Sequence, residues 1–377
     1  MPTAGGDIDD SFDIEQEEKS RRESAETRRL DQWLRILVAR AGSDLLLVPG
    51  APACILRDGQ VEKIEQHSLG ASEIEPAVIP ALSSHALKAY RERKITDSSY
   101  AVDGLGRFRI NLHRERGSAA AAVRALPSKV PFIGDLHLPP SVQALAKLPR
   151  GLVLIGGPAG SGKSTTMAAL VNEINRNESR HVLIIEDPVE YQHTHFKSII
   201  EQVEIGEDAP DFPTALRAAL RQAPDVIVVG EMRDAETMMI GVAAAETGHL
   251  VLSTLHTIDM ATTVSRIADS FPLERQNTIR QELAMSLTAV LTQTLLPSKG
   301  GGRVPAAELL MVGMGARQHI RRNQLQQLHQ EITLTKKKGS FTLEESLVQL
   351  IRSGKIEREA ALLCAIHPDD LEILLRN

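Results

Sequence analysis

The stretch Gly157-Pro158-Ala159-Gly160-Ser161-Gly162-Lys163-Ser164 fits the phosphate-loop pattern, in which a glycine and four further residues precede Gly-Lys-Ser. The apolar run before it, residues 152–155, is typical of a short buried strand, and residues 165–171 after it are typical of a helix. A strand, a glycine-rich loop and a helix N-terminus form an anion site, because backbone N–H groups and the positive end of the helix dipole face the phosphate oxygens. The sequence therefore predicts a nucleoside triphosphate site.

Individual residues of this loop have distinct expected tasks. The glycines allow the backbone to turn and to approach a nucleotide closely. Lys163 is expected to reach the β- and γ-phosphates, and the hydroxyl of Ser164 is expected to hold Mg²⁺. The alternative, a glycine-rich turn with a chance lysine, is disfavoured by the flanking strand and helix.

The composition of the 377-residue chain limits the other function classes. The length is enough for two or three domains, and a 42% hydrophobic content with only 3% aromatic residues predicts aliphatic cores. The net charge of −6 argues against a broad electrostatic contact with nucleic acid, so no direct nucleic-acid partner is expected. Cys54 and Cys364 lie far apart and form no Cys-x-x-Cys pair, which argues against a cysteine zinc site or a disulfide framework.

The sequence does not indicate a secretory signal or a membrane span. The polar N-terminal residues contain no apolar region typical of a secretory signal. No uninterrupted apolar run approaches the length of about 18 residues that a membrane span needs, so no transmembrane segment is expected. We therefore expect a cytoplasmic protein whose membrane association, if any, is peripheral or through a partner.

Composition shifts along the chain predict its domain organisation. Residues 1–28 are rich in charge and are expected to form a disordered tail. Residues 29–129 show a mixed α+β pattern, and the proline-containing segment 130–143 is interpreted as a linker. Residues 144–377 alternate strands and helices, which indicates an α/β domain with a parallel sheet, and its part from about 315 onward is mainly helical.

Local signals place several elements. Asp58-Gly59 predicts a tight hairpin turn, Asp234 is interpreted as the N-cap of a helix that ends before Gly248, and Thr342 has capping-box spacing to Glu345. The expected strands cover residues 44–48, 53–57, 107–113, 123–126, 152–155, 182–185, 226–229 and 250–252. The expected helices include residues 29–41, 80–93 and 234–247.

Acidic residues follow two of the expected parallel strands. Glu186 and Glu190 come after the strand at 182–185, and Glu231 comes after the strand at 226–229. Hydrolysis requires a carboxylate near the γ-phosphate to hold Mg²⁺ or activate water, and strand C-termini of a parallel sheet meet at one edge. These residues are thus candidates for hydrolysis, the alternative being that they are loop acids or helix caps.

Histidines and arginines complete the set of candidates. His249 and His256 bracket the strand at 250–252, where a histidine can contact the γ-phosphate or be structural. The first domain carries a cluster of arginines, which are Arg107, Arg109, Arg114, Arg116 and Arg124. They could neutralise charge on a nucleotide held by another domain, as arginine fingers do, or form a solvated basic face.

Together these motifs resemble the secretion and type IV pilus motor ATPases, with the closest match to the pilus-retraction (PilT-like) branch. The four boxes of that family appear in order and at matching spacing. They are Gly157–Thr165 (Walker A, with Ala159 where threonine is usual), Ile185–Glu190 (Asp box), Asp225–Asp234 (Walker B) and Ala245–Thr257 (His box). Residues 42–45 and 107–111 also match, so the resemblance covers about residues 30–365.

The resemblance implies a fold and an assembly. It implies an α/β fold in which a RecA-like P-loop ATPase domain follows a smaller α+β (PAS-like) N-terminal domain and ends in a helical C-terminal tail. It further implies a homo-hexameric ring, with nucleotide between domains and a hinge that we place at residues 131–140. An inner-membrane pilus platform protein is the implied partner.

The resemblance also implies roles for residues. Glu231 would act on the Mg²⁺ and water shell, Glu190 would help to activate water, and Ser164 would hold Mg²⁺ together with Glu231. His249 and His256 would contact the nucleotide, and Arg109 and Arg124, with Arg107 as a third candidate, would be arginine fingers. ATP and Mg²⁺ are the implied cofactors. The implied nucleotide-binding residues are Gly157, Gly160, Ser161, Gly162, Lys163, Ser164 and Thr165.

Two features bear on the branch of the family. Assembly and export members usually carry a four-cysteine zinc element and a longer N-terminal extension, neither of which this sequence shows. The retraction branch carries Ala-Ile-Arg-Asn-Leu-Ile-Arg-Glu, whereas the segment 315–322 here keeps Arg317, Ile320 and Arg321 but has Arg322 in place of the glutamate. Three hypotheses follow: a pilus-retraction motor, an ATPase of a related secretion or conjugation-like system, and an accessory subunit with little turnover.

Overall fold

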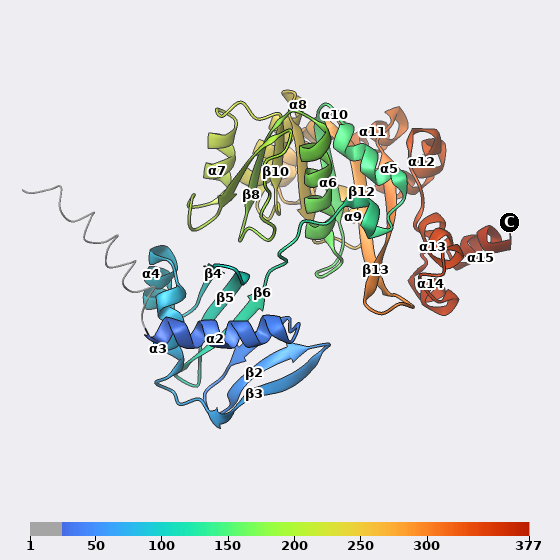
Figure 1. Ribbon diagram of the computed structural model, residues 1–377. Helices are drawn as coiled ribbons and strands as arrows, with labels where there is room; N and C mark the ends of the chain where they lie inside the picture. Colours follow the sequence, from blue (N-terminus) through green and yellow to red (C-terminus); the bar gives the residue numbers. More distant parts are fainter. Residues whose placement is uncertain (1–24, 377) are drawn as a thin grey trace, which may run out of the picture. The chain divides into compact units, whose positions relative to one another are not determined.

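The computed structural model describes residues 25–376, which fall into two compact units that meet between Ser128 and Lys129. Each unit is described by itself (Figure 1). The disordered tail that we expected over residues 1–28 lies outside the described residues up to position 24, and helix α2 begins at Ala25. In the described part of the chain, no helix combines the length and the apolar character that crossing a bilayer requires.

The first unit is a six-stranded antiparallel sheet in the order β3-β2-β1-β6-β5-β4. Its strands are β1 (Asp44–Leu47), β2 (Pro52–Arg57), β3 (Gln60–Ser68), β4 (Thr96–Val102), β5 (Gly106–Glu115) and β6 (Ser118–Ala125). Its helices are α2 (Ala25–Ala39), α3 (Ile74–Val78) and α4 (Ser84–Arg93). The predicted turn at Asp58-Gly59 is confirmed, because both residues have positive φ (+52° and +78°) and they join β2 to β3.

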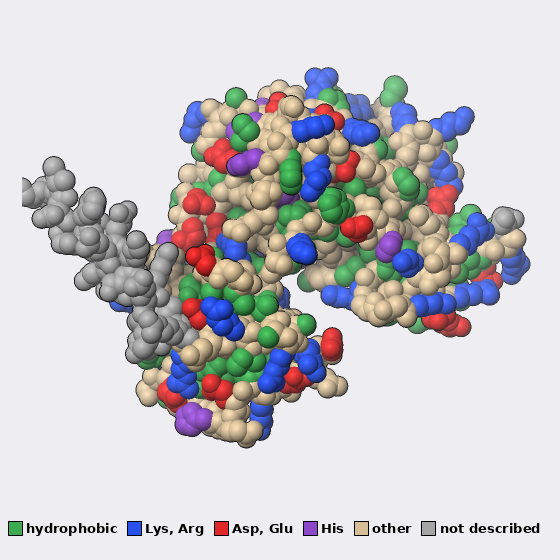
Figure 2. Space-filling view, in the orientation of Figure 1, with side chains coloured by type: hydrophobic (Ala, Val, Ile, Leu, Met, Phe, Trp, Pro, Cys, Tyr) green, Lys and Arg blue, Asp and Glu red, His purple; other side chains and the backbone are tan. Residues whose placement is uncertain are grey.

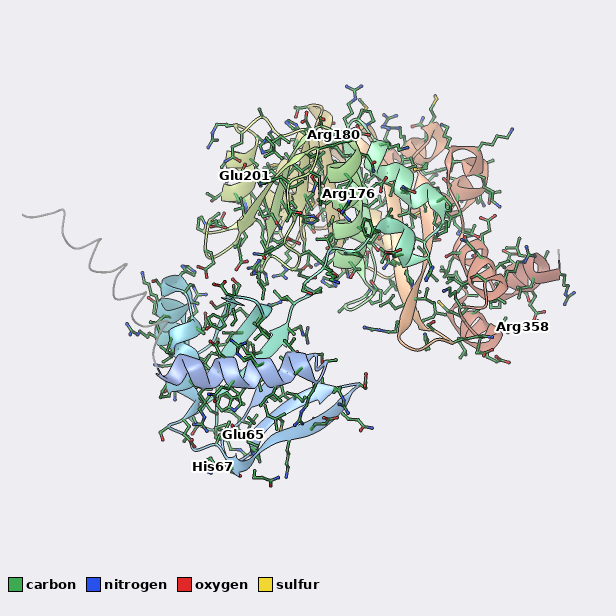
Figure 3. The ribbon with its side chains drawn as sticks, in the orientation of Figure 1. Glu65, His67, Arg176, Arg180, Glu201 and Arg358 are labelled. Carbon is green, nitrogen blue, oxygen red and sulfur yellow. The ribbon has the colours of Figure 1, made fainter. Side chains whose placement is uncertain are left out.

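Helix α2 supplies much of the core of the first unit. Its apolar residues Leu30, Trp33, Leu34 and Leu37 are at most 1% exposed and pack in one cluster with the sheet. The indole N–H of Trp33 donates to Glu65 Oε1 at 2.6 Å, so the one polar atom of this side chain is also satisfied (Glu65 is labelled in Figure 3). The helical spacing of these residues thus reflects burial against the unit's own sheet.

The second unit contains a seven-stranded sheet in the order β13-β12-β7-β11-β10-β8-β9, in which β13 alone is antiparallel to its neighbour. The strands are β7 (Gly151–Gly156), β8 (His181–Glu186), β9 (Ile199–Glu204), β10 (Val226–Val229), β11 (Leu250–Leu255), β12 (Leu287–Pro297) and β13 (Arg303–Met311). The helices around them are α5 (Pro140–Gln143), α6 (Lys163–Asn177), α7 (Phe212–Ala219), α8 (Ala235–Glu246), α9 (Met260–Asp269) and α10 (Leu273–Ser286). The predicted α/β class with a parallel sheet is confirmed.

Alternation along the strands builds a core on each face of this sheet. On β7, Leu152 and Leu154 belong to the core shared with α8 and α10, whereas Val153 and Ile155 belong to the core shared with α6. Figure 1 shows the corresponding helices on the two faces. A strand covered on both sides must be apolar throughout, which is why residues 152–155 read as a continuous apolar run.

The C-terminal part is helical, as predicted. Its helices are α11 (Met314–Arg321), α12 (Leu328–Leu334), α13 (Leu343–Arg352), α14 (Arg358–Cys364) and α15 (Pro368–Arg376). The last three share a separate apolar cluster with Leu296, Val304 and Ala306 of the β12–β13 hairpin. Figure 2 shows several Lys and Arg side chains over the end of this helical part, and acidic, basic and apolar groups interspersed elsewhere on the visible face of the unit.

Helix caps expected from the sequence are confirmed by their hydrogen bonds. Asp234 Oδ1 accepts from the N–H of Thr237 at 2.8 Å at the start of α8. Thr342 and Glu345 form both bonds of a capping box at the start of α13. Gly248, which follows α8, has φ of +115°, a conformation that favours glycine.

The segment 130–143, expected to be a linker, is packed against the second unit. The carbonyl of Pro131 accepts from Asn172 Nδ2 at 3.1 Å, and the ring of Phe132 lies 4.8 Å from the guanidinium of Arg176 on α6 (labelled in Figure 3). Ile133, Leu138 and Val142 are buried in the core that α6 shares. Residues 131–140, where we placed the hinge implied by the resemblance, are therefore packed as part of the second unit, since proline restricts φ without preventing side chains from packing.

Five strands lie outside the predicted ranges, which are β3, β4, β9, β12 and β13, although the predicted turn at Asp58-Gly59 implied a strand where β3 lies. The two that matter most for the site are β12 and β13, which pair over residues 289–297 and 303–311. Helix α10 ends at Ser286 and strand β12 begins at the next residue, Leu287. No glycine or proline stands at this junction to mark the change from helix to strand.

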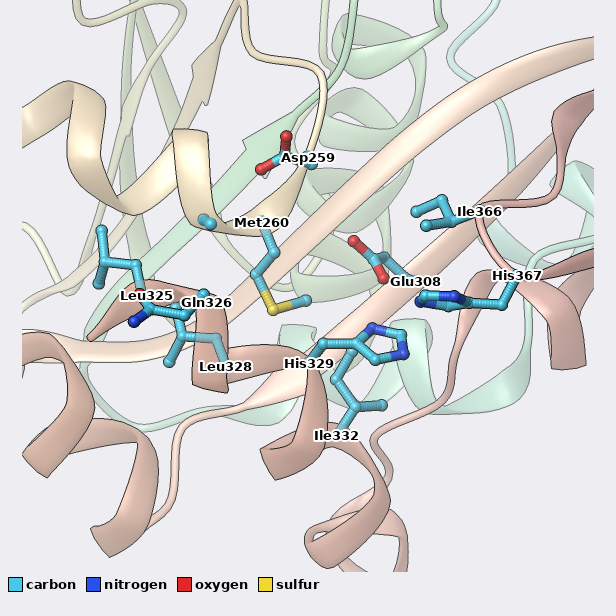
Figure 4. Close-up of a pocket in the computed structure, with 11 residues that line it drawn as sticks. Asp259, Met260, Glu308, Leu325, Gln326, Leu328, His329, Ile332, Ile366 and His367 are labelled. Atoms are coloured by element: carbon cyan, nitrogen blue, oxygen red, sulfur yellow. The ribbon is translucent and has the colours of Figure 1, made fainter. Parts of the chain in front are cut away.

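Strand β13 places an acidic residue, Glu308, inside the second unit. Its carboxylate points into a cavity of about 270 Å³ that is also lined by Asp259, His329 and His367 (Figure 4). Thr292 Oγ1 donates to Glu308 Oε1 at 2.9 Å. Burial raises the pKa of Glu308 to about 7, helped by the carboxylates of Glu344 and Asp259 and opposed by the Thr292 hydrogen bond and His367.

The raised pKa of Glu308 predicts a pH-dependent stability. Because the folded state holds this proton more tightly than the unfolded state, with its ordinary pKa near 4.5, the fold is penalised progressively as pH rises from 4.5 to 7 and fully above it. The penalty is on the order of 3 kcal/mol. The Glu308→Gln variant should therefore lose less stability than the native chain between pH 5.5 and 8.5 in urea denaturation. Equal pH slopes for the two proteins would contradict this assignment.

Candidate nucleotide-binding and hydrolysis site

The phosphate-loop sequence forms a tight connection between β7 and α6. Gly157, Gly160 and Gly162 have φ of +152°, +73° and +89°, which side chains rarely adopt. A Cβ on Gly157 would also lie under 3.0 Å from Ser161 Oγ, and one on Gly162 would lie 2.8 Å from Gln293 Nε2. Space and conformation thus both require glycine at Gly157 and Gly162.

Lys163, the first residue of α6, is turned into the loop. Its Nζ donates to the carbonyls of Gly157 at 2.8 Å and Pro158 at 2.9 Å, and the whole residue is only 6% exposed. Burial lowers the pKa of Lys163, and the carboxylates of Glu231 and Glu190 oppose that shift. The predicted basic and acidic residues are therefore near one another in the folded chain.

Glu231 is held beside the loop by two basic side chains. Arg233 Nε donates to Glu231 Oε2 at 2.8 Å, and the other oxygen lies 3.4 Å from His256 Nε2. The second ring nitrogen of His256 lies 3.3 Å from Lys163 Nζ. Lys163, His256 and Glu231 thus form a connected series at the C-terminal ends of the parallel strands. The guanidinium of Arg233 also lies 3.7 Å from the carboxylate of Asp187.

The segment that carries Glu190 is attached to the start of α6. The hydroxyl of Tyr191 lies 3.1 Å from Thr165 Oγ1, and burial raises the pKa of Tyr191. The N–H of Val189 donates to Glu204 Oε2 on β9 at 3.1 Å. Glu190, between these two anchored residues, is half-buried on the same side of the sheet as Lys163.

His249 is not brought to the loop. It precedes β11, whereas His256 follows it, and β11 runs parallel to β7 with Leu250 opposite Gly151 and Leu255 opposite Gly156. The six residues of β11 separate the two histidines by about 20 Å, so that His249 lies at the N-terminal ends of the parallel strands and His256 at their C-terminal ends. His249 Nδ1 lies 3.0 Å from the carbonyl of Ala244 at the end of α8. The expectation that both histidines border one site within the chain is therefore not met.

Arg109 and Arg124 lie in the first unit. They are directly opposite each other on β5 and β6. Arg109 Nε lies 3.3 Å from Asp97 Oδ1, and Arg124 Nε donates to Asp44 Oδ1 at 2.8 Å. Two adjacent, partly exposed guanidinium groups on one sheet could contribute to a site elsewhere, so their role as arginine fingers stays a prediction.

Three residues near the site had no role assigned from the sequence: Arg233, Tyr191 and Gln293. Arg233 and Tyr191 adjoin the quoted acidic motifs, so proximity in sequence was an available signal. Gln293 had none, because it lies on β12, which was not predicted.

The residues present fit MgATP. The first N–H groups of α6 have no acceptor within the helix, and the buried hydroxyl of Ser161 has no hydrogen-bond partner among the described residues. Across residues 25–376, no group of three or more His, Cys, Asp or Glu side chains could hold a metal. Mg²⁺ is commonly bound through nucleotide phosphates, water and one or two protein groups, and Ser164 and Glu231 stay the two protein groups predicted for it from the sequence.

Comparisons with known proteins place the chain in a family. A family model described as "Type II/IV secretion system protein" matches residues 139–339. The chain is 39% identical over 332 residues to "Type IV pilus retractation ATPase PilT" of Pseudomonas aeruginosa, covering 88% of this chain and 96% of the relative. It is 34% identical over 347 residues to "Type IV pilus ATPase PilU" of the same organism, covering 92% and 91%.

A solved structure is also similar. It is described as "Crystal Structure of the Pilus Retraction Motor PilT and Bound ADP" and has 41% sequence identity and a TM-score of 0.81, covering 90% of this chain and 97% of that one. The match spans both units, so the N-terminal antiparallel sheet, the ATPase domain and the helical C-terminal part all have counterparts in it.

The contact between Arg233 and Glu231 predicts a selective defect. Arg233→Gln removes the hydrogen bond that orients the Glu231 carboxylate, so ATP turnover should fall about tenfold, the usual cost of a lost charge-assisted bond at a reacting group. ADP affinity should change less than about threefold, since Arg233 does not touch the loop. Steady-state ATPase assays and calorimetric titration measure both. The matched control is Arg217→Gln, which breaks an exposed pair with Glu236 and should leave turnover intact.

Proposed function

The chain belongs to the type II/IV secretion system protein family, and from this premise we propose that it is an ATP-hydrolysing, hexameric motor that powers type IV pilus retraction. The observation that carries the proposal is the series Lys163–His256–Glu231 beside the phosphate loop. It occurs in a chain that aligns with a pilus-retraction ATPase over 96% of that relative's length.

The site suggests how its residues act on ATP. Lys163 would exchange the carbonyls of Gly157 and Pro158 for phosphate oxygens, which offer a stronger charge-assisted bond to its ammonium group. Ser164 and Glu231 would hold Mg²⁺, which when bound neutralises charge on the β- and γ-phosphates. The carboxylate of Glu190 would take a proton from the attacking water. His256 would keep Glu231 and Lys163 apart at a fixed spacing while hydrogen-bonding to either.

The assembly follows from the placement of the remaining candidates. We propose that Arg109 and Arg124 complete the site as arginine fingers, which requires the first unit to meet a bound nucleotide. His249 lies at the end of the strands opposite its own phosphate loop. In a ring of six copies it would contact nucleotide by facing a neighbouring subunit. The motor would work in the cytoplasm, where ATP is available, against an inner-membrane pilus platform protein.

One observation favours a second candidate, a PilU-type accessory ATPase. The retraction-branch motif falls on α11, where Arg317 Nη1 donates to the carbonyls of Ala284 and Met285 at 2.6 Å and Ile320 is buried. These matching residues therefore hold α11 against the end of α10. Arg322, which replaces the glutamate of the motif, is exposed at the C-cap of α11 and does not take part in holding α11 against α10. A charge reversal at an exposed position, beside matching residues that hold the helix in place, is what a different partner would produce.

The Glu231 assignment predicts the loss of catalysis with retention of binding. Glu231→Ala should lower ATP turnover at least about a hundredfold, because the carboxylate acts on Mg²⁺ and water. Affinity for ADP should stay within a few-fold, since the loop and Lys163 are unchanged. Phosphate-release assays and calorimetry measure the two quantities. Glu236→Ala, an exposed glutamate on α8, is the control and should behave as the native chain; native turnover in Glu231→Ala would refute the role.

A deletion strain distinguishes the candidate functions. Loss of a retraction motor should leave excess pili that do not retract, whereas loss of an assembly motor should leave none. An accessory role should show as retraction that weakens under load but persists, and a secretion role as normal pili with a secretion defect. Electron microscopy and live imaging of labelled pili provide the measurement, and complementation with Arg322→Glu tests the altered residue directly.

A further inference from the structure

A single buried carboxamide, that of Gln293 on β12, connects two parts of the phosphate-binding element. Its Nε2 donates to the carbonyl of Ser161 in the loop at 2.6 Å. Its Oε1 accepts from Thr166 Oγ1, in the first turn of α6, at 2.7 Å. The residue is 4% exposed, so water does not compete for these bonds. One side chain thus ties the loop and the helix to the same neighbouring strand.

The backbone of β12 also lies against the loop at this point. Thr292 is opposite Gly156, the last residue of β7, so Gln293 stands level with the start of the loop. A Cβ on Gly157 would lie under 3.0 Å from the carbonyl oxygen of Gln293, and one on Gly162 would lie 2.8 Å from its Nε2. Two of the loop's glycines are therefore required by β12 as well as by any nucleotide.

The bond to Ser161 has a consequence for the direction of the next N–H group. In a trans peptide the C=O and N–H groups point in opposite directions. With the carbonyl of Ser161 held toward Gln293, the N–H of Gly162 must point away from β12. A phosphate loop binds anions through N–H groups of fixed direction. Holding this peptide unit therefore orders the loop for binding in advance, which lowers the free-energy cost of ordering it when a ligand binds.

A carboxamide meets both demands at this position. It offers a donor to the Ser161 carbonyl and an acceptor to the Thr166 hydroxyl. Glutamate would lose the donor, and leucine, of similar size, would leave the carbonyl and the hydroxyl without their partner in a buried place.

We propose that Gln293 is a positioning residue of the nucleotide site, which acts by holding the Ser161–Gly162 peptide and the first turn of α6 in the phosphate-binding arrangement. The proposal rests on the proposed nucleotide site. Gln293 acts through the loop: it stabilises the binding geometry, and its loss raises the dissociation constant for nucleotide.

The primary test is Gln293→Leu in the full chain, with MgADP as the probe. Losing both bonds should raise the dissociation constant for MgADP about tenfold in calorimetric titration, since one buried hydrogen bond commonly accounts for that factor. Hydrogen exchange of the amides of residues 160–166 should be faster in the variant, both with and without MgADP. That second measurement reports on the loop itself and does not depend on turnover.

Asn175 provides a matched control at the other end of α6. Its carboxamide also donates one bond, to the carbonyl of Thr194 at 2.7 Å, and accepts one, from the N–H of Phe196 at 3.0 Å, and the residue is 1% exposed. Asn175→Leu should lower the melting temperature comparably but leave the MgADP dissociation constant within about twofold of the native value, since an equal number of bonds is lost far from the loop.

Thr166 variants extend the test if Gln293→Leu does not fold. Thr166→Val removes the hydroxyl but keeps the shape, and should weaken MgADP binding, whereas Thr166→Ser keeps the hydroxyl and should bind as the native chain. Native binding by Gln293→Leu or Thr166→Val, with only a lowered melting temperature, would overturn the inference and leave the proposed function standing. Failure of the native chain to bind MgADP, with Lys163→Ala no different, would overturn both.

Discussion

The loop between β7 and α6 can take its shape because glycine stands wherever it needs positive φ, at Gly157, Gly160 and Gly162, and neighbouring atoms leave no room for a Cβ at two of these positions. Thr263 Oγ1 crowds Gly156, Ser161 crowds Gly157, and Gln293 crowds both Gly157 and Gly162. The positive φ values at these glycines let the backbone turn where β7 ends, and α6 starts at Lys163. A helix that starts immediately after a strand directs its free N–H groups at one point, and the rest of the site is arranged around that point.

The parallel sheet supplies the remaining groups because its strand ends converge. Strand β7 is central, with β11 and β12 on either side and β10 one strand further away. His256 follows β11 and Glu231 follows β10, so both lie near Lys163 although they are 93 and 68 positions away in sequence. The same rule explains why His249, at the start of β11, is distant. In a parallel sheet, residues before and after one strand cannot share an edge.

Local sequence predicted the elements whose signals are themselves local. The hairpin at Asp58-Gly59, the Asp234 cap and the capping box at Thr342 each depend on atoms within a few residues. Most central strands were found because burial on both faces requires an apolar run. Strand β12 was missed because no glycine or proline separates it from α10, and β13 was missed with it although Gly300-Gly301-Gly302 is a turn signal. The linker was misjudged because its prolines concealed the buried positions Ile133, Leu138 and Val142.

The sequence by itself predicted a phosphate loop at Gly157–Thr165, acidic and histidine residues, Glu231 and His256, beside it, and an α/β fold; the structure confirms the fold and places Glu231 and His256 beside Lys163. The sequence could do so because each depends on a short motif or on a strand end that periodicity reveals. Only the tertiary structure decided that Gln293 holds the Ser161 peptide, that Arg233 orients Glu231, and that His249 lies across the sheet. Those facts depend on which strands become neighbours, and strand order is set by packing over long sequence distances rather than by any local pattern.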